Sequence, residues 1–262
     1  MSDSAQTTGG ASAEARAWIL GRLREGLADP SAAFKVPGSG EPLPGPPTPV
    51  THADGDSRAL AERFGASLDA VLGSHEMVEG ADTVVDRVLA RIAALREAGS
   101  ADGLSFARAL AWAPDALGVH DLAERLGREE ISVIVPDDLH DPSQRRDVAG
   151  AAVGVTSVDA ALASTGTLVM RADAHRSRVA SLLPLHHIVL VPTSRIHGTA
   201  EGWIASLRED GRLDETLRDG CQLTFITGPS KSADIELTLT LGVHGPKTVH
   251  AIIFHDQGLT ET

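Results

Sequence analysis

Five short, uninterrupted runs of apolar residues in the second half of the chain constrain its fold more than any other feature. They are rich in branched side chains and too short to be typical helices. The runs are Ile131–Val135, Gly166–Met170, His187–Val191, Leu223–Thr227 and Val249–Phe254. A run of this length without polar alternation is typical of a strand covered on both faces, as in a parallel sheet between layers.

Helical patterns precede and separate these runs. In these segments apolar residues recur at the spacing of one helix face, and HEMVEG at 75–80 suggests a short strand. The expected helices are Ser57–Leu72, Asp82–Glu97, Ala113–Leu126, Glu201–Arg208 and Ser232–Leu241. Strands that alternate with helices predict an α/β fold with a mostly parallel sheet flanked by helices.

The first fifty residues differ from the rest in composition and in the spacing of apolar residues. Residues 1–13 are small and polar, 14–28 carry apolar residues at helical spacing, and 36–49 are rich in proline. We therefore expect residues 1–50 to form a mobile tail, a helical extension and a Pro-rich linker. Residues 51–262 then form one α/β domain, which is an ordinary length for a single core.

The acidic composition and the single cysteine exclude several classes of protein. The formal net charge of −13, from 36 acidic and 23 basic residues, repels nucleic-acid phosphates and anionic lipid headgroups. Cys221 is the only cysteine, so this chain alone holds no disulfide and no iron–sulfur cluster. We expect a cytoplasmic protein without a membrane span, because neither a secretory leader nor a long apolar segment is apparent.

Three glycine-containing turns lie at strand ends, where open α/β folds usually bind ligands. The first is within 160–170, where Thr165, Gly166 and Thr167 lead into an apolar strand. Hydroxyl groups beside a glycine can line an anion pocket. The same pattern is also common in an ordinary turn that begins a strand, so both interpretations stay open.

The second turn, within 191–203, follows a strand and precedes a helix. It contains Ser194, Arg195 and His197, and the helix carries Glu201. Arg195 can bind a carboxylate or phosphate through two parallel hydrogen bonds, with His197 beside it as an acid–base candidate. The alternative is a surface ion pair for Arg195 and an ordinary loop role for His197.

The third turn, TGPSKSADIE at 227–236, follows the strand LTFIT. Gly228 permits a tight turn, and Lys231 adds positive charge where a helix N-terminus would favour an anion. A well-capped helix without a ligand explains Asp234 and Glu236 equally well.

Several familiar motifs are missing from the sequence. It has no GxxxxGK[ST], no GxGxxG and no GxSxG pattern, so nucleotide hydrolysis, Rossmann-type dinucleotide binding and an α/β-hydrolase triad are not indicated. The neighbours His186 and His187 should point to opposite faces of a strand and cannot readily share one ion. We therefore expect no metal site.

Three sequence blocks together resemble the LUD-domain family. They are DAALASTGTLVM at 159–170, LLPLHHIVLVPTSRI at 182–196 and TGPSKSADIELTLTLGVHGPKTVHAIIF at 227–254. The last block, with GPS-[KR]-x-ADIE followed by LGVHGP, is the most specific. WILGRLREGL, at 18–27, is also similar to the beginning of family members. The resemblance covers most of the chain and weakens through the tail and linker.

The resemblance implies a fold related to the ribose-5-phosphate isomerase and CoA-transferase group (NagB/RpiA/CoA transferase-like). It also implies a role in oxidising L-lactate to pyruvate in a three-protein system whose other two members carry iron–sulfur clusters. No cofactor is then expected in this chain. The motif positions that the resemblance marks as a ligand-binding cleft for a small carboxylate or other anion are Thr165, Gly166, Thr167, Ser194, Arg195, Gly228, Pro229, Ser230, Lys231, Asp234, Glu236, His244 and Gly245.

Two functions follow as hypotheses. The first is an accessory subunit, without a redox centre of its own, that works through iron–sulfur partners in L-lactate oxidation. The second is a stand-alone isomerase or CoA-transferase-like enzyme that acts on a small anionic metabolite, which rests mainly on fold analogy. For that enzyme His197, Glu201 and Glu236 are the catalytic candidates, and Arg195 with Lys231 would clamp the anion.

Overall fold

The computed structural model describes residues 8–27, 55–99, 103–137, 139–218, 222–233 and 239–256. The chain divides into two units, residues 1–48 and 49–262. The first unit contains helix α1 (Thr8–Leu27), which begins before the predicted start at residue 14, so part of the expected tail is helical. The Pro-rich segment and the predicted boundary at residue 50 lie outside the described residues, and the boundary stays a prediction.

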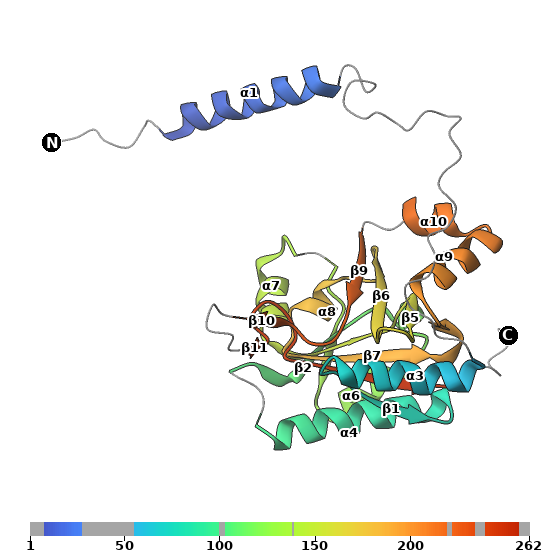
Figure 1. Ribbon diagram of the computed structural model, residues 1–262. Helices are drawn as coiled ribbons and strands as arrows, with labels where there is room; N and C mark the ends of the chain where they lie inside the picture. Colours follow the sequence, from blue (N-terminus) through green and yellow to red (C-terminus); the bar gives the residue numbers. More distant parts are fainter. Residues whose placement is uncertain are drawn as a thin grey trace. The chain divides into compact units, whose positions relative to one another are not determined.

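The second unit alternates strands and helices along the chain (Figure 1). Its elements are α3 (Ser57–Ala70), β1 (Ser74–Val78), η1 (Ala81–Thr83), α4 (Val84–Glu97), β2 (Ser105–Ala111), α5 (Pro114–Leu117), α6 (Leu122–Arg128), β3 (Ser132–Ile134), α7 (Pro142–Ala149), β4 (Ala151–Thr156), β5 (Ala160–Leu162), β6 (Thr167–Ala172), α8 (Val179–Leu182), β7 (His186–Pro192), η2 (Thr193–Arg195), β8 (Ile196–His197), α9 (Ala200–Glu209), α10 (Leu213–Arg218), β9 (Gln222–Ile226), β10 (Lys231–Ala233), β11 (Leu239–Leu241) and β12 (Thr248–Phe254). Within the described ranges, no helix is long and apolar enough to span a membrane.

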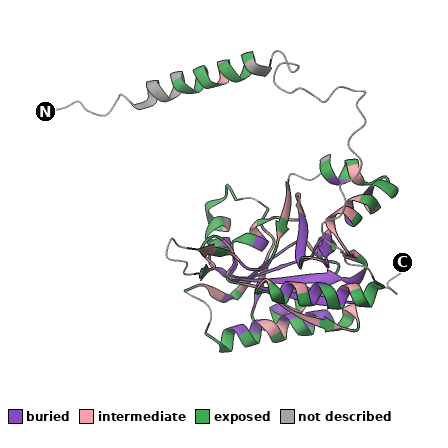
Figure 2. Cartoon of the chain, in the orientation of Figure 1, coloured by how far each residue is buried: buried purple, intermediate pink, exposed green. Residues whose placement is uncertain are grey.

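A six-stranded parallel sheet forms the centre of this unit. Its strand order is β1-β12-β7-β4-β2-β3, and every pairing within it is parallel. All residues of β4 and β7 are buried, as expected for central strands covered on both faces. Figure 2 shows the buried residues concentrated along this sheet. The predicted mostly parallel α/β architecture is confirmed, while the relation to the isomerase and CoA-transferase group stays a prediction.

A second, mixed sheet has the order β8-β5-β6-β9. Strand β5 pairs parallel to β8 and antiparallel to β6, and β6 pairs antiparallel to β9. Two of the five apolar runs, 166–170 and 223–227, therefore lie outside the parallel sheet. Figure 1 shows β5, β6 and β9 on one side of the main sheet, with α4 and α6 on the other.

The second sheet separates two hydrophobic cores. Ala161, Leu168 and Met170 belong to the large core around the main sheet. Val169 lies in a smaller core together with Trp203 and other α9 residues. Because side chains alternate between the faces of a strand, Arg171 lies on the same face of β6 as Val169 and points toward α9.

The predicted helix at 232–241 is wrong. Its two described ends form β10 and β11, which pair antiparallel; residues 234–238 lie outside the described part. The segment LTLTL at 237–241 alternates apolar and β-branched polar residues, a pattern that favours a strand. The predicted helix at 113–126 is also interrupted, because Gly118 has a left-handed backbone (φ 72°) between α5 and α6.

His187 is fully buried in β7, opposite Gly154 of β4. Its Nε2 lies 2.8 Å from the hydroxyl oxygen of Thr156, and its Nδ1 has no hydrogen-bond partner within the described residues. Burial lowers the pKa of His187 to about 3, because the charged imidazolium would be desolvated. The folded protein therefore keeps this ring neutral.

We predict that stability falls on acidification through this histidine. The unfolded chain binds a proton near pH 6.5 and the folded chain does not bind it until about pH 3, so stability is complete above the unfolded pKa. Between these two pH values, protonation of His187 in the unfolded chain lowers the free energy of unfolding by up to about 1.4 kcal/mol for each pH unit of acidification. Urea unfolding at pH 7 and pH 5 measures this slope, which His187→Gln should reduce. Exposed His175, as His175→Gln, is the control; equal slopes in all three proteins would contradict the prediction.

Candidate functional site

A polar cavity of about 390 Å³ lies beside the second sheet and α9. It is named here the arginine cavity, because arginines from four separate positions line it. The lining residues are Asp159, Arg171, Arg176, Ser194, Arg195, His197, Trp203, Ser206, Leu207, Asp210, Arg212 and Thr216. The second sequence motif thus contributes three predicted residues to a single cavity: Ser194, Arg195 and His197.

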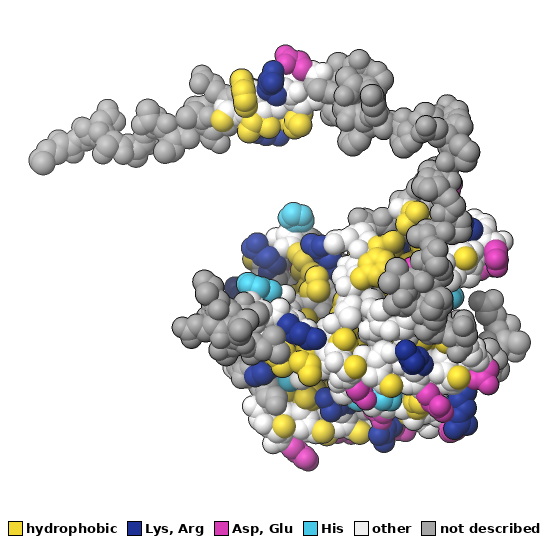
Figure 3. Space-filling model, in the orientation of Figure 1, with side chains coloured by type: hydrophobic (Ala, Val, Ile, Leu, Met, Phe, Trp, Pro, Cys, Tyr) yellow, Lys and Arg dark blue, Asp and Glu magenta, His cyan; other side chains and the backbone are white. Residues whose placement is uncertain are grey.

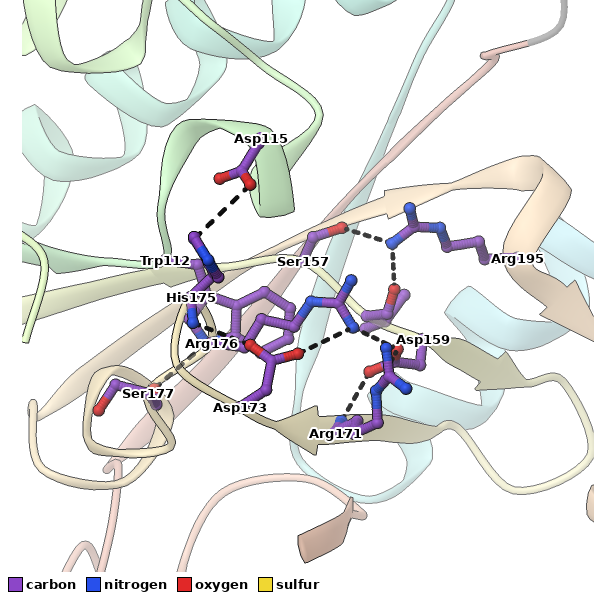
Figure 4. Close-up of polar contacts among 11 residues, drawn as sticks. Trp112, Asp115, Ser157, Asp159, Arg171, Asp173, His175, Arg176, Ser177 and Arg195 are labelled. Atoms are coloured by element: carbon purple, nitrogen blue, oxygen red, sulfur yellow. Dashed lines mark hydrogen bonds and ion pairs between the residues drawn. The ribbon is translucent and has the colours of Figure 1, made fainter. Parts of the chain in front are cut away.

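Asp159 holds two of these arginines (Figure 4). Its carboxylate accepts a hydrogen bond of 2.6 Å from the main-chain N–H of Arg171 and one of 2.9 Å from Nη1 of Arg176. The Nε of Arg171 lies 4.0 Å from the same carboxylate. All three side chains are about four-fifths buried, with 17–22% exposure, so solvent screens these ion pairs less than surface pairs.

Arg176 is also held from its other side. Its guanidinium carbon lies 5.9 Å from the ring centroid of Trp112, within the range of a cation–π contact. The indole N–H of Trp112 donates to the carbonyl of Ser177 at 3.2 Å, which fixes the ring (Figure 4). Arg176 is therefore oriented before any ligand binds.

Arg195 reaches the cavity from η2, at the end of β7. Its Nη1 donates to the carbonyl of Val158 and lies 3.5 Å from the hydroxyl of Ser157. Burial lowers the pKa of Arg195, while Asp159 raises it; a guanidinium remains protonated under such conditions. The turn itself is fixed by Asp256, whose carboxylate accepts bonds from the N–H and the hydroxyl of Ser194.

His197 and Glu201 have different positions. His197 lines the arginine cavity, and burial lowers its pKa, so the imidazole is neutral at pH 7 and able to accept a proton. Glu201 does not line the cavity. It lies in the first turn of α9, where a carboxylate stabilises the helix dipole, and its catalytic role stays a prediction.

The arginine cavity is positive although the chain is acidic overall. Its lining carries four arginines and two aspartates, a formal balance of +2, against −13 for the whole chain. The Nε of Arg171 is buried and makes no hydrogen bond to any described residue. An unsatisfied, charged donor in a cavity of this sign favours an anionic ligand.

The third sequence motif lines a separate cavity of about 340 Å³. The predicted residues that line it are Gly228, Ser230, Lys231, His244 and Gly245. Lys231 and Arg195 therefore lie in different cavities, and the predicted joint anion clamp is not formed. Asp234 and Glu236 lie outside the described residues, so their roles stay predictions.

The first motif lines neither cavity. The hydroxyl oxygens of Thr165 and Thr167 lie 2.8 Å apart, and that of Thr167 lies 2.8 Å from Thr227. This chain of hydroxyl groups joins the first motif to the third. Pro229, also predicted to bind a ligand, is buried beside this junction and does not line the second cavity.

Gly166 and Gly228 pack against the C-terminal end of α3. Both have left-handed backbones, with φ of 64° and 78°. A Cβ on Gly166 would lie 2.4 Å from the main-chain nitrogen of Leu68, and one on Gly228 would lie 2.3 Å from the carbonyl oxygen of Val71. These glycines are needed for the approach of backbone to backbone, whatever the motifs bind.

The sequence did not single out five charged residues of the arginine cavity: Asp159, Arg171, Arg176, Asp210 and Arg212. A local signal existed for Arg171, which directly follows the apolar run at 166–170 and, within β6, takes the face opposite to Met170. The pairing of Asp159 with Arg176 depends on the return of β6 beside β5, which no local pattern specifies. Among the described residues, no group of three or more His, Cys, Asp or Glu side chains is placed to hold a metal ion.

The fold and the arginine cavity define an α/β protein with a polar cavity lined by four arginines. The model of the LUD domain matches residues 66–254, so the chain belongs to the LUD domain family.

Several known proteins are similar to parts of the chain. Lactate utilization protein C from Exiguobacterium sp. is 42% identical over 124 residues, which cover 45% of this chain and 51% of that protein. The protein of the same name from Shouchella clausii is 32% identical over 151 residues, covering 56% and 62%. The chain thus spans between half and two thirds of these two relatives.

A solved structure shares the fold. The crystal structure of a DUF162 family protein from Deinococcus radiodurans superposes with a TM-score of 0.52 and 18% identity, covering 77% of this chain and 99% of that one. At this identity, the likeness concerns the fold alone.

We predict that Gly228→Ala destabilises the protein more than Gly118→Ala. Both glycines have left-handed backbones, but a Cβ at Gly118 has no neighbour within 4 Å, so this variant reports backbone strain alone. The clash with Val71 should add about 1–3 kcal/mol to the loss of unfolding free energy. Urea unfolding of both variants measures the difference. Equal losses of unfolding free energy in the two variants would contradict a steric clash between a Cβ at position 228 and Val71.

Proposed function

We propose that this chain is a cytoplasmic subunit, without a redox centre of its own, of a system that oxidises L-lactate to pyruvate with iron–sulfur partner proteins. Membership of the LUD domain family and the names of the relatives support this proposal. The single cysteine in the sequence supports it too, since iron–sulfur clusters usually require several thiolates. Electrons from lactate would then pass to clusters held by the partners.

The observation that carries the proposal is the arginine cavity. Its preformed donors suit a small carboxylate or other anion, because an arginine can bind such a group through two parallel N–H···O bonds. Arg176 and Arg195 are already held by protein contacts, so little side-chain freedom is lost when an anion binds. In this proposal the chain supplies anion recognition and the partners supply the redox chemistry.

Reconstitution tests the role in lactate oxidation. The full chain is purified anaerobically from its native cells by mild affinity capture, and co-eluting polypeptides and iron are measured. We expect iron-rich partners in a defined ratio and lactate-dependent dye reduction that falls when this chain is omitted. Unchanged dye reduction without the chain would overturn the proposal.

The second candidate is a stand-alone isomerase or CoA-transferase-like enzyme that acts on a small anionic metabolite. The observation that favours it is neutral His197 in the same cavity as four arginines, an arrangement suited to proton transfer beside a bound anion. Turnover of an anionic substrate by the isolated chain, lost in His197→Gln, would support this alternative over the subunit.

A subunit that acts through partners needs a docking surface. An apolar groove of about 490 Å³ lies between α7 and α8. Leu139, Leu182 and Leu183 in this groove are 37–48% exposed, and Arg145 and Arg178 also line it. Figure 3 shows apolar side chains with Lys and Arg side chains beside them over these helices. Apolar contact and basic charge suit an amphipathic segment with acidic flanks on an iron–sulfur partner.

We predict that Leu183→Asp reduces the iron that co-purifies with the chain at least about tenfold, because it places a charge in the apolar groove and repels acidic flanks. Leu72→Asp is the matched control, since Leu72 is 52% exposed and lies outside the groove. Iron per captured chain is measured for both variants. Equal iron recovery in the two variants would place the docking surface elsewhere.

A further inference from the structure

The charge of the arginine cavity restricts its ligand. Four arginines and two aspartates line it. Burial lowers the pKa of His197, so this side chain adds no positive charge at pH 7. Arg176 is paired with both Asp159 and Asp173, at 2.9 and 3.7 Å. The positive charge that remains for a ligand therefore comes mainly from Arg171, Arg195 and Arg212, and it favours an anion that several arginines can contact at once.

The arginines of the cavity come from separate elements of the fold. Arg171 comes from β6, Arg195 from η2 and Arg212 from the connection between α9 and α10. The free Nε of Arg171 is buried. A planar carboxylate presents two oxygens in one plane, whereas a phosphate group presents three oxygens that diverge. Donors from several elements therefore match a phosphate group better than a carboxylate.

The size and remaining lining of the cavity add a second restriction. Its volume of about 390 Å³ falls in the range of about 300–1,000 Å³ that is typical of small-molecule sites, and a three-carbon acid is small for such a site. Trp203 and Leu207 add buried apolar surface, and Ser206 and Thr216 add hydroxyl groups. These side chains can contact an organic moiety attached to the anionic group.

We propose that the arginine cavity binds a phosphate monoester, with the dianionic phosphate among Arg171, Arg195 and Arg212 and its organic body toward Trp203. This inference rests on the anion site of the proposed function and not on the role in lactate oxidation. L-Lactate itself is then not the preferred occupant of this cavity.

Binding to the full isolated chain tests this inference without any partner. Calorimetric titrations compare three phosphate monoesters, glycerol 3-phosphate, glucose 6-phosphate and adenosine monophosphate, with L-lactate and inorganic phosphate at equal ionic strength. At least one ester should bind at least about tenfold more tightly than L-lactate and than inorganic phosphate, because it combines two charges with a body. Its affinity should fall below about pH 6, where the phosphate gains a proton.

Two substitutions of exposed arginines locate the binding. Arg212→Gln should weaken the best ester at least about tenfold, the effect expected for losing a hydrogen bond to a charged group. Arg208→Gln is the matched control, because Arg208 is exposed on α9 and does not line the cavity. Arg195→Lys keeps the charge but removes the two-point donor, and it should also weaken binding.

The outcomes separate this inference from the proposed function. Tighter binding of L-lactate than of every ester, or equal losses in Arg212→Gln and Arg208→Gln, would overturn the phosphate site. Neither result would alter a dependence of lactate oxidation on this chain in the reconstituted system. Conversely, the isolated chain could bind an ester while lactate oxidation does not depend on the chain. That result would support the phosphate site and overturn the proposed function.

Discussion

The carboxylate of Asp159 is the interaction on which the arginine cavity depends. Several arginines close together repel one another, and burial makes that repulsion stronger. Asp159 accepts from both Arg171 and Arg176, and it also raises the pKa of Arg195. One buried anion therefore allows three cations to share a cavity and still leaves an excess of positive charge for a ligand.

The sequence allowed the main layers of the fold to be predicted, because buried strands and amphipathic helices leave local patterns. The runs that became β7 and β12 are central in the parallel sheet. The same kind of run in β6 and β9 forms antiparallel pairs in another sheet, since an apolar run records burial and not the identity of its neighbours. The 232–241 segment was misread because favourable helix capping was given more weight than the alternation of its leucines and threonines.

The candidate site was predicted in part for a similar reason. Ser194, Arg195 and His197 were found because they follow a recognisable strand, and the structure places them in one cavity. Their partners Asp159 and Arg176 are adjacent to them only through tertiary packing. Gly166 and Gly228 were predicted to bind a ligand, which stays a prediction, and their close contacts are with the C-terminal end of α3. The observed reason for glycine at these two positions is the close approach of the main chain at Leu68 and Val71.

The strand order has a consequence for how the chain reaches its folded state. β12 is the final strand of the described chain, yet it lies inside the sheet between β1 and β7. Until residues 248–254 have left the ribosome, β1 has no neighbour in the sheet and β7 has an unpaired edge. Such long-range closure slows folding and exposes a template for association with other chains. Completion of this sheet therefore waits for residues 248–254, and until they pair, the edge of β7 is open to other strands.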